Sequence, residues 1–194
     1  MSTLKARVSG AWVATAAVGK VRLGGVDIPF GGAPAPAYEA LSWPAAPTFT
    51  DLSDGTSTYN MGVQFSLVSG KNCVGVRWRV PDTVATPIGG PHSIALWRVS
   101  DLALLASKTF VPAPGGYQDV LFDAPAACST GLEYVASIYT NHYVFRAAGG
   151  NWPVTSPSGN VVADIGKLIA DQPPNTYPSS SQNSYYYISP LIAL

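Results

Sequence analysis

The chain has 194 residues, with eleven basic and eleven acidic side chains, so its formal net charge at pH 7 is zero. This balance excludes a general electrostatic attraction to nucleic acid or to an anionic membrane surface. Only 11% of the residues are charged, against about 25% in a typical soluble domain. Such a composition is common in assembled or extracellular β-proteins and would be unusual for a free cytosolic enzyme. Nineteen glycines and seventeen prolines argue against a helical protein, because both interrupt helices.

Membrane and export signals are not evident in the sequence. No apolar run approaches the length of about 20 residues that spans a bilayer. The N-terminal charges in residues 1–7 are followed by no apolar core segment, so we predict no signal peptide. We therefore expect synthesis in a cytoplasm, where the protein is kept until it is assembled or released.

Residues 4–30 contain a short internal repeat. The segments 5–13 and 20–28 share the pattern Lys-x-Arg-aliphatic-x-Gly-x-x-aliphatic. In each copy, charged and apolar residues alternate before a glycine that favours a turn, and this pattern predicts two small β-hairpins. Two hairpins this small are only marginally stable alone in water. We therefore expect them either to dock on a larger assembly or to be ordered only by contact with their own domain. Exposed strand edges are templates for pairing with another chain, and the candidate attachment residues are Lys5, Arg7, Trp12, Lys20 and Arg22.

This opening resembles that of small minor tail and other virion proteins of tailed phages that infect high-GC Gram-positive bacteria. The resemblance covers residues 1–33 and rests on a short motif. It implies that an N-terminal β-hairpin arm attaches the chain to other virion proteins. It also implies localisation in a virion that is assembled in the host cytoplasm.

Residues 34–48 are rich in proline and alanine and predict a semi-ordered linker. A main domain is expected over residues 49–194. Its best strand is 60–68, where four apolar residues alternate with smaller or polar ones; in 73–80, Val74, Val76, Trp78 and Val80 are expected to point inward. The expected strands cover 60–68, 73–80, 92–99, 104–110, 117–122, 133–140, 143–147 and 184–194.

Roughly eight strands with regular turn signals predict an all-β fold, an antiparallel two-sheet sandwich of jelly-roll-like form. Residues 161–170 differ from the other segments. There Ile165, Leu168 and Ile169 would share one face of a helix, so one short helix is predicted.

The main domain also resembles an uncharacterised bacterial module. The resemblance rests on the segments 59–65, 92–97 and 116–122 and on the run Asn141-His142-Tyr143. Their order matches that of the module over residues 49–194. That module occurs in secreted multidomain proteins beside immunoglobulin-like and glycan-active domains. The resemblance implies a β-sandwich with a carbohydrate-related role and carries over no catalytic residue.

The sequence holds no recognisable catalytic constellation. It lacks the nucleophile elbow, the zinc-protease motif, the phosphate loop and the Cys-x-x-Cys pair. The two glutamates are Glu39 in the linker and Glu133 at a strand start, whereas a glycosidase needs two carboxylates facing across its substrate. We expect no enzyme, no cofactor and no metal site.

Two histidines and two cysteines have open roles. His92 and His142 lie at expected strand ends, where they are either part of a ligand site or loop caps that bond to the backbone. Capping is favoured, because metal sites usually need three or four ligands. Cys73 and Cys128 either form a disulfide or remain buried thiols, and cytoplasmic synthesis favours thiols.

Aromatic residues offer a binding surface. Trp97 is out of phase with Ile94 and Leu96, so it is expected on the opposite, exposed face of its sheet. Exposed aromatic rings serve either subunit interfaces, the first interpretation, or sugar stacking, the second. The candidate ligand-binding residues are Trp97, His92, His142, Tyr143 and Trp152.

These observations predict a non-enzymatic virion protein, either a minor tail or a head-decoration protein. Its sandwich would be displayed for host adhesion or particle stabilisation, as a homo-oligomer or against a cell-surface glycan. The alternative is a carbohydrate-binding module of a bacterial surface or secreted system. A third alternative is an accessory domain of a hydrolase.

Overall fold

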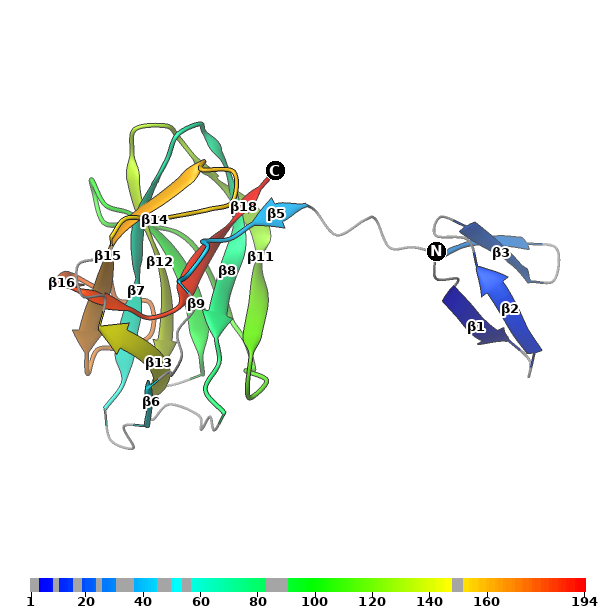
Figure 1. Ribbon diagram of the computed structural model, residues 1–194, viewed down its shortest axis with the longest axis horizontal. Helices are drawn as coiled ribbons and strands as arrows, with labels where there is room; N and C mark the ends of the chain where they lie inside the picture. Colours follow the sequence, from blue (N-terminus) through cyan, green and yellow to red (C-terminus); the bar gives the residue numbers. More distant parts are fainter. Residues whose placement is uncertain are drawn as a thin grey trace. The chain divides into compact units, whose positions relative to one another are not determined.

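The chain consists of two compact units, Met1–Ala37 and Tyr38–Leu194. We describe it from a computed structural model (Figure 1). The described residues are 4–8, 11–15, 19–23, 26–30, 37–44, 50–53, 57–82, 91–147 and 152–194.

The N-terminal unit contains two antiparallel hairpins. Strand β1 (Leu4–Val8) pairs with β2 (Ala11–Thr15), and β3 (Gly19–Leu23) pairs with β4 (Val26–Phe30). Two residues separate the strands in each case, Ser-Gly in the first hairpin and Gly-Gly in the second. Two-residue connections rich in glycine are typical of tight hairpins, because glycine tolerates the backbone angles that they need. The predicted β-hairpin arm is confirmed.

The C-terminal unit is an antiparallel sandwich of two main sheets, as predicted. The larger sheet has seven strands in the order β10-β9-β12-β7-β15-β14, with β16 beside β15, and the smaller has four in the order β11-β8-β18-β5. The larger sheet contains β7 (Tyr59–Leu67), β9 (Ser93–Arg98), β10 (Ala103–Thr109), β12 (Glu133–Thr140), β14 (Val154–Thr155), β15 (Val161–Ala170) and β16 (Ser180–Gln182). The smaller contains β5 (Tyr38–Glu39), β8 (Lys71–Arg79), β11 (Tyr117–Cys128) and β18 (Ile188–Ala193).

A third, small sheet completes the unit, with β17 (Ser184–Tyr185), β13 (His142–Ala147) and β6 (Thr50–Ser53) in that order. The core lies between the two main sheets. Phe65 of β7, Leu96 of β9 and Trp78 of β8 are fully buried in one cluster. The alternation that predicted the inward face of 60–68 is confirmed, since Met61 and Phe65 have no exposed surface.

The predicted helix over 161–170 is wrong. These residues form β15, which pairs with β7 along its whole length and buries Val161 and Ala163 in the core. A register shift between Ala163 and Ile165 breaks the strict alternation, so the apolar spacing resembles that of a helix. The strand prevails because β-branched residues fit a sheet and because β15 satisfies backbone groups of β7.

Strand β8 has an irregularity that changes one predicted orientation. Gly75 lies opposite Leu191, but Cys73 lies opposite the next residue, Ile192, so Val74 is an extra residue in the ladder. As a result Cys73 faces the main core, and Val74 joins a separate cluster with Leu191. Val74 was expected to point inward beside Val76, and this expectation is corrected.

Within the described residues 37–44, the chain differs from the semi-ordered linker that is predicted over residues 34–48. Residues 38–44 belong to the sandwich unit, where β5 pairs with the end of β18 (Figure 1). The amide of Ser42 donates to the carbonyl of Thr155 at 2.9 Å, and the Trp43 indole donates to the hydroxyl of Ser189 at 2.8 Å. This segment therefore passes from the edge of the smaller sheet to the edge of the larger one.

Candidate functional site

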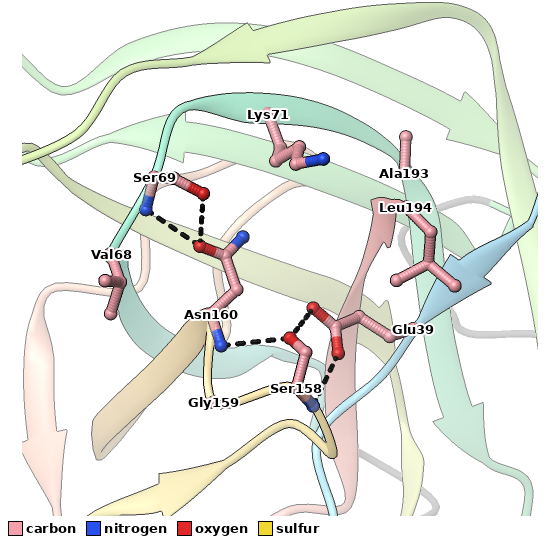
Figure 2. Close-up of a pocket in the computed structure, with 9 residues that line it drawn as sticks. All are labelled: Glu39, Val68, Ser69, Lys71, Ser158, Gly159, Asn160, Ala193 and Leu194. Atoms are coloured by element: carbon pink, nitrogen blue, oxygen red, sulfur yellow. Dashed lines mark hydrogen bonds between the residues drawn. The ribbon is translucent and has the colours of Figure 1, made fainter.

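A polar groove lies beside β5, where this edge strand meets the β7–β8 turn and the turn before β15 (Figure 2). Its volume is about 360 Å³. A neighbouring depression of about 660 Å³ shares Glu39 and Ser158 with it and continues past Tyr38 and Arg77. The polar groups that line the groove are Glu39, Ser69, Lys71, Ser158 and Asn160.

Glu39 is held in place by one residue of the opposite turn. Its Oε1 accepts a hydrogen bond from the Ser158 hydroxyl at 2.6 Å, and its Oε2 accepts one from the Ser158 amide at 3.1 Å. The turn closes with a bond from the Gly159 amide to the Ser156 carbonyl, and Gly159 has a φ of 76°, which favours glycine. Only 8% of Glu39 is exposed, so its carboxylate is a fixed acceptor at one side of the groove.

The other side of the groove presents hydrogen-bond donors. The side-chain oxygen of Asn160 accepts from both the amide and the hydroxyl of Ser69, each at 2.8 Å. These bonds turn the Asn160 amide nitrogen toward the groove, where the Lys71 side chain also extends (Figure 2). Within the described part of the chain, neither the Lys71 ammonium nor the Asn160 Nδ2 has a hydrogen-bond partner.

Tyr38 and Arg77, which line the neighbouring depression, both bind the carboxylate of Asp119. Asp119 accepts from Arg77 Nε at 2.6 Å and Nη2 at 2.9 Å, and the Tyr38 hydroxyl donates to it at 2.9 Å. The hydrogen bonds from Arg77 lower the pKa of Asp119, and the bond to Asp119 raises the pKa of Tyr38. Since Asp119 neutralises Arg77, Lys71 is, among the described residues that line the groove and the depression, the cation whose charge is available to a ligand.

This arrangement suits binding of a polar molecule. One side offers a carboxylate, the other an ammonium and an amide N–H group, and Val68 and Ala193 add apolar surface. Pockets that bind small molecules combine apolar lining with a few placed polar groups in this way. Among the described residues, no three His, Cys, Asp or Glu side chains gather in a group that suits a metal ion.

Trp97 lies on the sheet face predicted for it, but it is not an exposed platform. It is 6% exposed, its indole nitrogen donates to the Ser137 hydroxyl at 3.1 Å, and Tyr177 packs edge-on against it at 5.9 Å between ring centroids. The prediction of exposure is wrong, because the chain after β15 returns across this face and covers the ring.

The remaining candidate ligand residues also lie outside the groove. His92 is buried against the rings of Trp78 and Phe110, and its ring centroid lies 6.0 Å from each of theirs. His142 is a buried residue of β13. The last two candidates, Tyr143 and Trp152, are half-buried and pack against other aromatic rings. Tyr143 contacts Tyr59, Phe145 and Tyr186, and Trp152 contacts Trp43 and Tyr185.

The five attachment residues fall on the arm. Their backbone positions lie on β1, β2 and β3, and their side chains are outside the described part of the structure: Lys5, Arg7, Trp12, Lys20 and Arg22. The register places Arg7 opposite Trp12 and Arg22 opposite Asp27.

Sequence reasoning missed all the polar residues of the groove. The sequence places Glu39 in the predicted linker, and no motif in it singles out Ser158 or Asn160. One available signal was the scarcity of glutamate, since the sequence has one other, Glu133. No local pattern connects Glu39 to Ser158, because 119 positions separate them.

A protein-family model matches most of the chain. Residues 45–188 match the model of a family described as a domain of unknown function, DUF4082. No curated protein matches the chain. In the residues that the structure describes, no helix has the length and hydrophobicity to cross a membrane. Since the matched region covers most of its length, the chain belongs to the DUF4082 family of uncharacterised domains.

Proposed function

We propose that the protein is a non-enzymatic component of a tailed-phage virion, a minor tail or head-decoration protein. In this proposal the N-terminal arm binds other virion proteins, and the sandwich is displayed for adhesion or stabilisation. The observation that carries it is the division of the chain into a small two-hairpin unit and a separate sandwich with its own core.

The hairpins support an attachment role by their size and their edges. Among the described strands, each arm strand pairs only with the other strand of its own hairpin. Two-stranded hairpins are marginally stable alone, and their free edges can pair with another chain. In both hairpins the first strand carries a lysine and an arginine at alternate positions, Lys5 and Arg7 in β1 and Lys20 and Arg22 in β3. Alternate positions of a strand lie on the same face of its hairpin, so the sequence places the lysine and the arginine of each first strand at positions on one face.

The experiment is co-sedimentation with phage particles that lack the native copy. Full-length protein is expected to sediment with the particles, and a variant lacking residues 1–33 is expected to stay in the supernatant. Replacing Lys5, Arg7, Lys20 and Arg22 together by glutamine should weaken sedimentation, whereas Lys108→Gln in the sandwich serves as the matched control. Equal sedimentation of the full-length and arm-deleted proteins, or of neither, would overturn the proposal.

The groove favours a second candidate, a carbohydrate-binding module of a bacterial surface or secreted system. The fixed carboxylate of Glu39 and the donors of Lys71 and Asn160 suit a ligand with several hydroxyl groups. A defined sugar that binds the full chain, with no arm-dependent binding to particles, would favour this candidate over the first.

A further inference from the structure

The hydrogen-bonding groups of the groove are divided by type. On one side the Glu39 carboxylate is an acceptor, and Ser158 holds both of its oxygens in position. On the other side the Asn160 amide cannot rotate to present its oxygen, because two bonds from Ser69 occupy that oxygen. Donors alone therefore face the ligand from Asn160 Nδ2 and from the Lys71 ammonium (Figure 2).

We propose that the groove binds a saccharide that carries a carboxylate, such as a uronic acid unit. The sugar carboxylate accepts hydrogen bonds from Lys71 and Asn160 Nδ2, and a hydroxyl group of the sugar donates to Glu39. This inference rests on the glycan-binding role proposed above, and it assigns the ligand class and its orientation.

The positive charge of Lys71 is the reason to expect an acidic ligand in the groove. A neutral hydroxyl makes ordinary hydrogen bonds with an amide or an ammonium, whereas a carboxylate makes charge-assisted bonds that are about twice as strong. Arg77, which lines the neighbouring depression, is already bound in a bidentate pair with Asp119. Glu39 repels a second carboxylate, so it directs the acidic group of the ligand to the Lys71 side.

The dimensions of the groove suit a short oligosaccharide. Its volume of about 360 Å³ is at the low end of the range of about 300–1,000 Å³ for ligand pockets. Glu39 and Ser158 also line the neighbouring depression of about 660 Å³, where Tyr38 offers an aromatic ring. An oligosaccharide bound through its acidic unit in the groove can therefore continue past Tyr38.

The test compares two disaccharides that differ at one carbon, which is a carboxylate in the first and a hydroxymethyl group in the second. Full-length protein is titrated calorimetrically with cellobiouronic acid and with cellobiose. The acid is expected to bind at least about tenfold more tightly at low salt, with a preference that falls as salt rises. Equal affinity for the two sugars would overturn the inference while leaving the glycan-binding role standing. Absence of binding by both would overturn the inference and count against that role, without affecting the particle test of the arm.

Matched variants locate the carboxylate. Lys71→Gln should remove the preference for the acid, and Lys71→Arg should retain it. Asn160→Asp keeps an oxygen for Ser69 but replaces the facing donor by a negative acceptor, so it should abolish binding of the acid while sparing cellobiose. Lys108→Gln, on the edge strand β10 and outside the groove, is the control and should change neither affinity. A preference that survives Lys71→Gln would contradict the proposed orientation, provided the variant's unfolding temperature matches that of the unmodified protein.

Discussion

Glu39 and Ser158 lie 119 positions apart in the chain, yet the Glu39 carboxylate accepts hydrogen bonds from both the hydroxyl and the amide of Ser158. The pair joins the edge strand β5 to the turn that precedes β15. It thus connects the edges of the two main sheets and forms the wall between the groove and its neighbouring depression.

Removing the Ser158 hydroxyl tests the strength of this connection. Ser158→Ala loses the bond to Glu39 and the bond that the hydroxyl accepts from the Asn160 amide. We expect the free energy of unfolding to fall by about 1 kcal/mol, the usual net value of a hydrogen bond in a partly exposed site. Urea denaturation measures the change, with the exposed Ser129→Ala as control. Identical unfolding midpoints for the two variants would show that the pair does not stabilise the sandwich.

The Asp119 pair predicts a pH dependence of stability. Hydrogen bonds from Arg77 are the main cause of the lowered pKa of Asp119 in the folded state. A carboxyl group with a lowered folded-state pKa stabilises the fold above its unfolded-state pKa of about 3.9, and this contribution is lost as pH falls through the folded-state value. Stability should therefore decline below about pH 4 more steeply in the unmodified protein than in Asp119→Asn.

Denaturant midpoints measured between neutral pH and pH 3 check this prediction. Tyr38→Phe is the informative comparison, because it removes the second donor and leaves Arg77 in place. It should keep most of the pH dependence. If Asp119→Asn declines as steeply as the unmodified protein, the paired carboxylate is not the source of the acid sensitivity.

Trp97 should behave as a structural residue. Trp97→Ala removes a ring that is buried against Tyr177 and a hydrogen bond to Ser137, so it should destabilise the fold by about 3 kcal/mol or more. Thermal unfolding measures the loss, and Val111→Ala, at a residue 86% exposed, is the control. Sugar affinity, measured well below the unfolding temperature, should not change. A loss of affinity with little loss of stability would restore Trp97 as a ligand residue.

The two cysteines should be unreactive thiols in the native protein. Cys73 and Cys128 are both free and buried. Burial raises the pKa of Cys73 above its ordinary value and raises the pKa of Cys128 to about 11, so little thiolate forms near pH 8. Ellman's reagent should label neither residue in buffer and both after unfolding in guanidinium. Rapid native labelling, or the absence of thiols in the unfolded chain, would contradict the structure.

Some features of the fold and of the groove cannot be predicted from the sequence, because they depend on segments that are distant in the chain. The bulge at Val74 and the register shift in β15 depend on neighbouring strands, so local alternation misassigned both. The sequence predicts the correct sheet face for Trp97, but the ring that covers it belongs to Tyr177, which lies eighty positions later in the chain. Period and propensity describe a residue's own segment and contain no information about which distant segment returns over it.

The all-β class, the two hairpins of the arm and the inward faces of strands such as β7 are predictable from the amino-acid sequence, because they follow from alternation and turn residues within short segments. The groove is not, since Glu39, Lys71 and Asn160 come from three separate segments and meet only after β5 pairs with β18 and β15 pairs with β7. Sheet pairing brings together residues that are distant in sequence, and its register depends on the hydrogen bonding and burial of the whole domain.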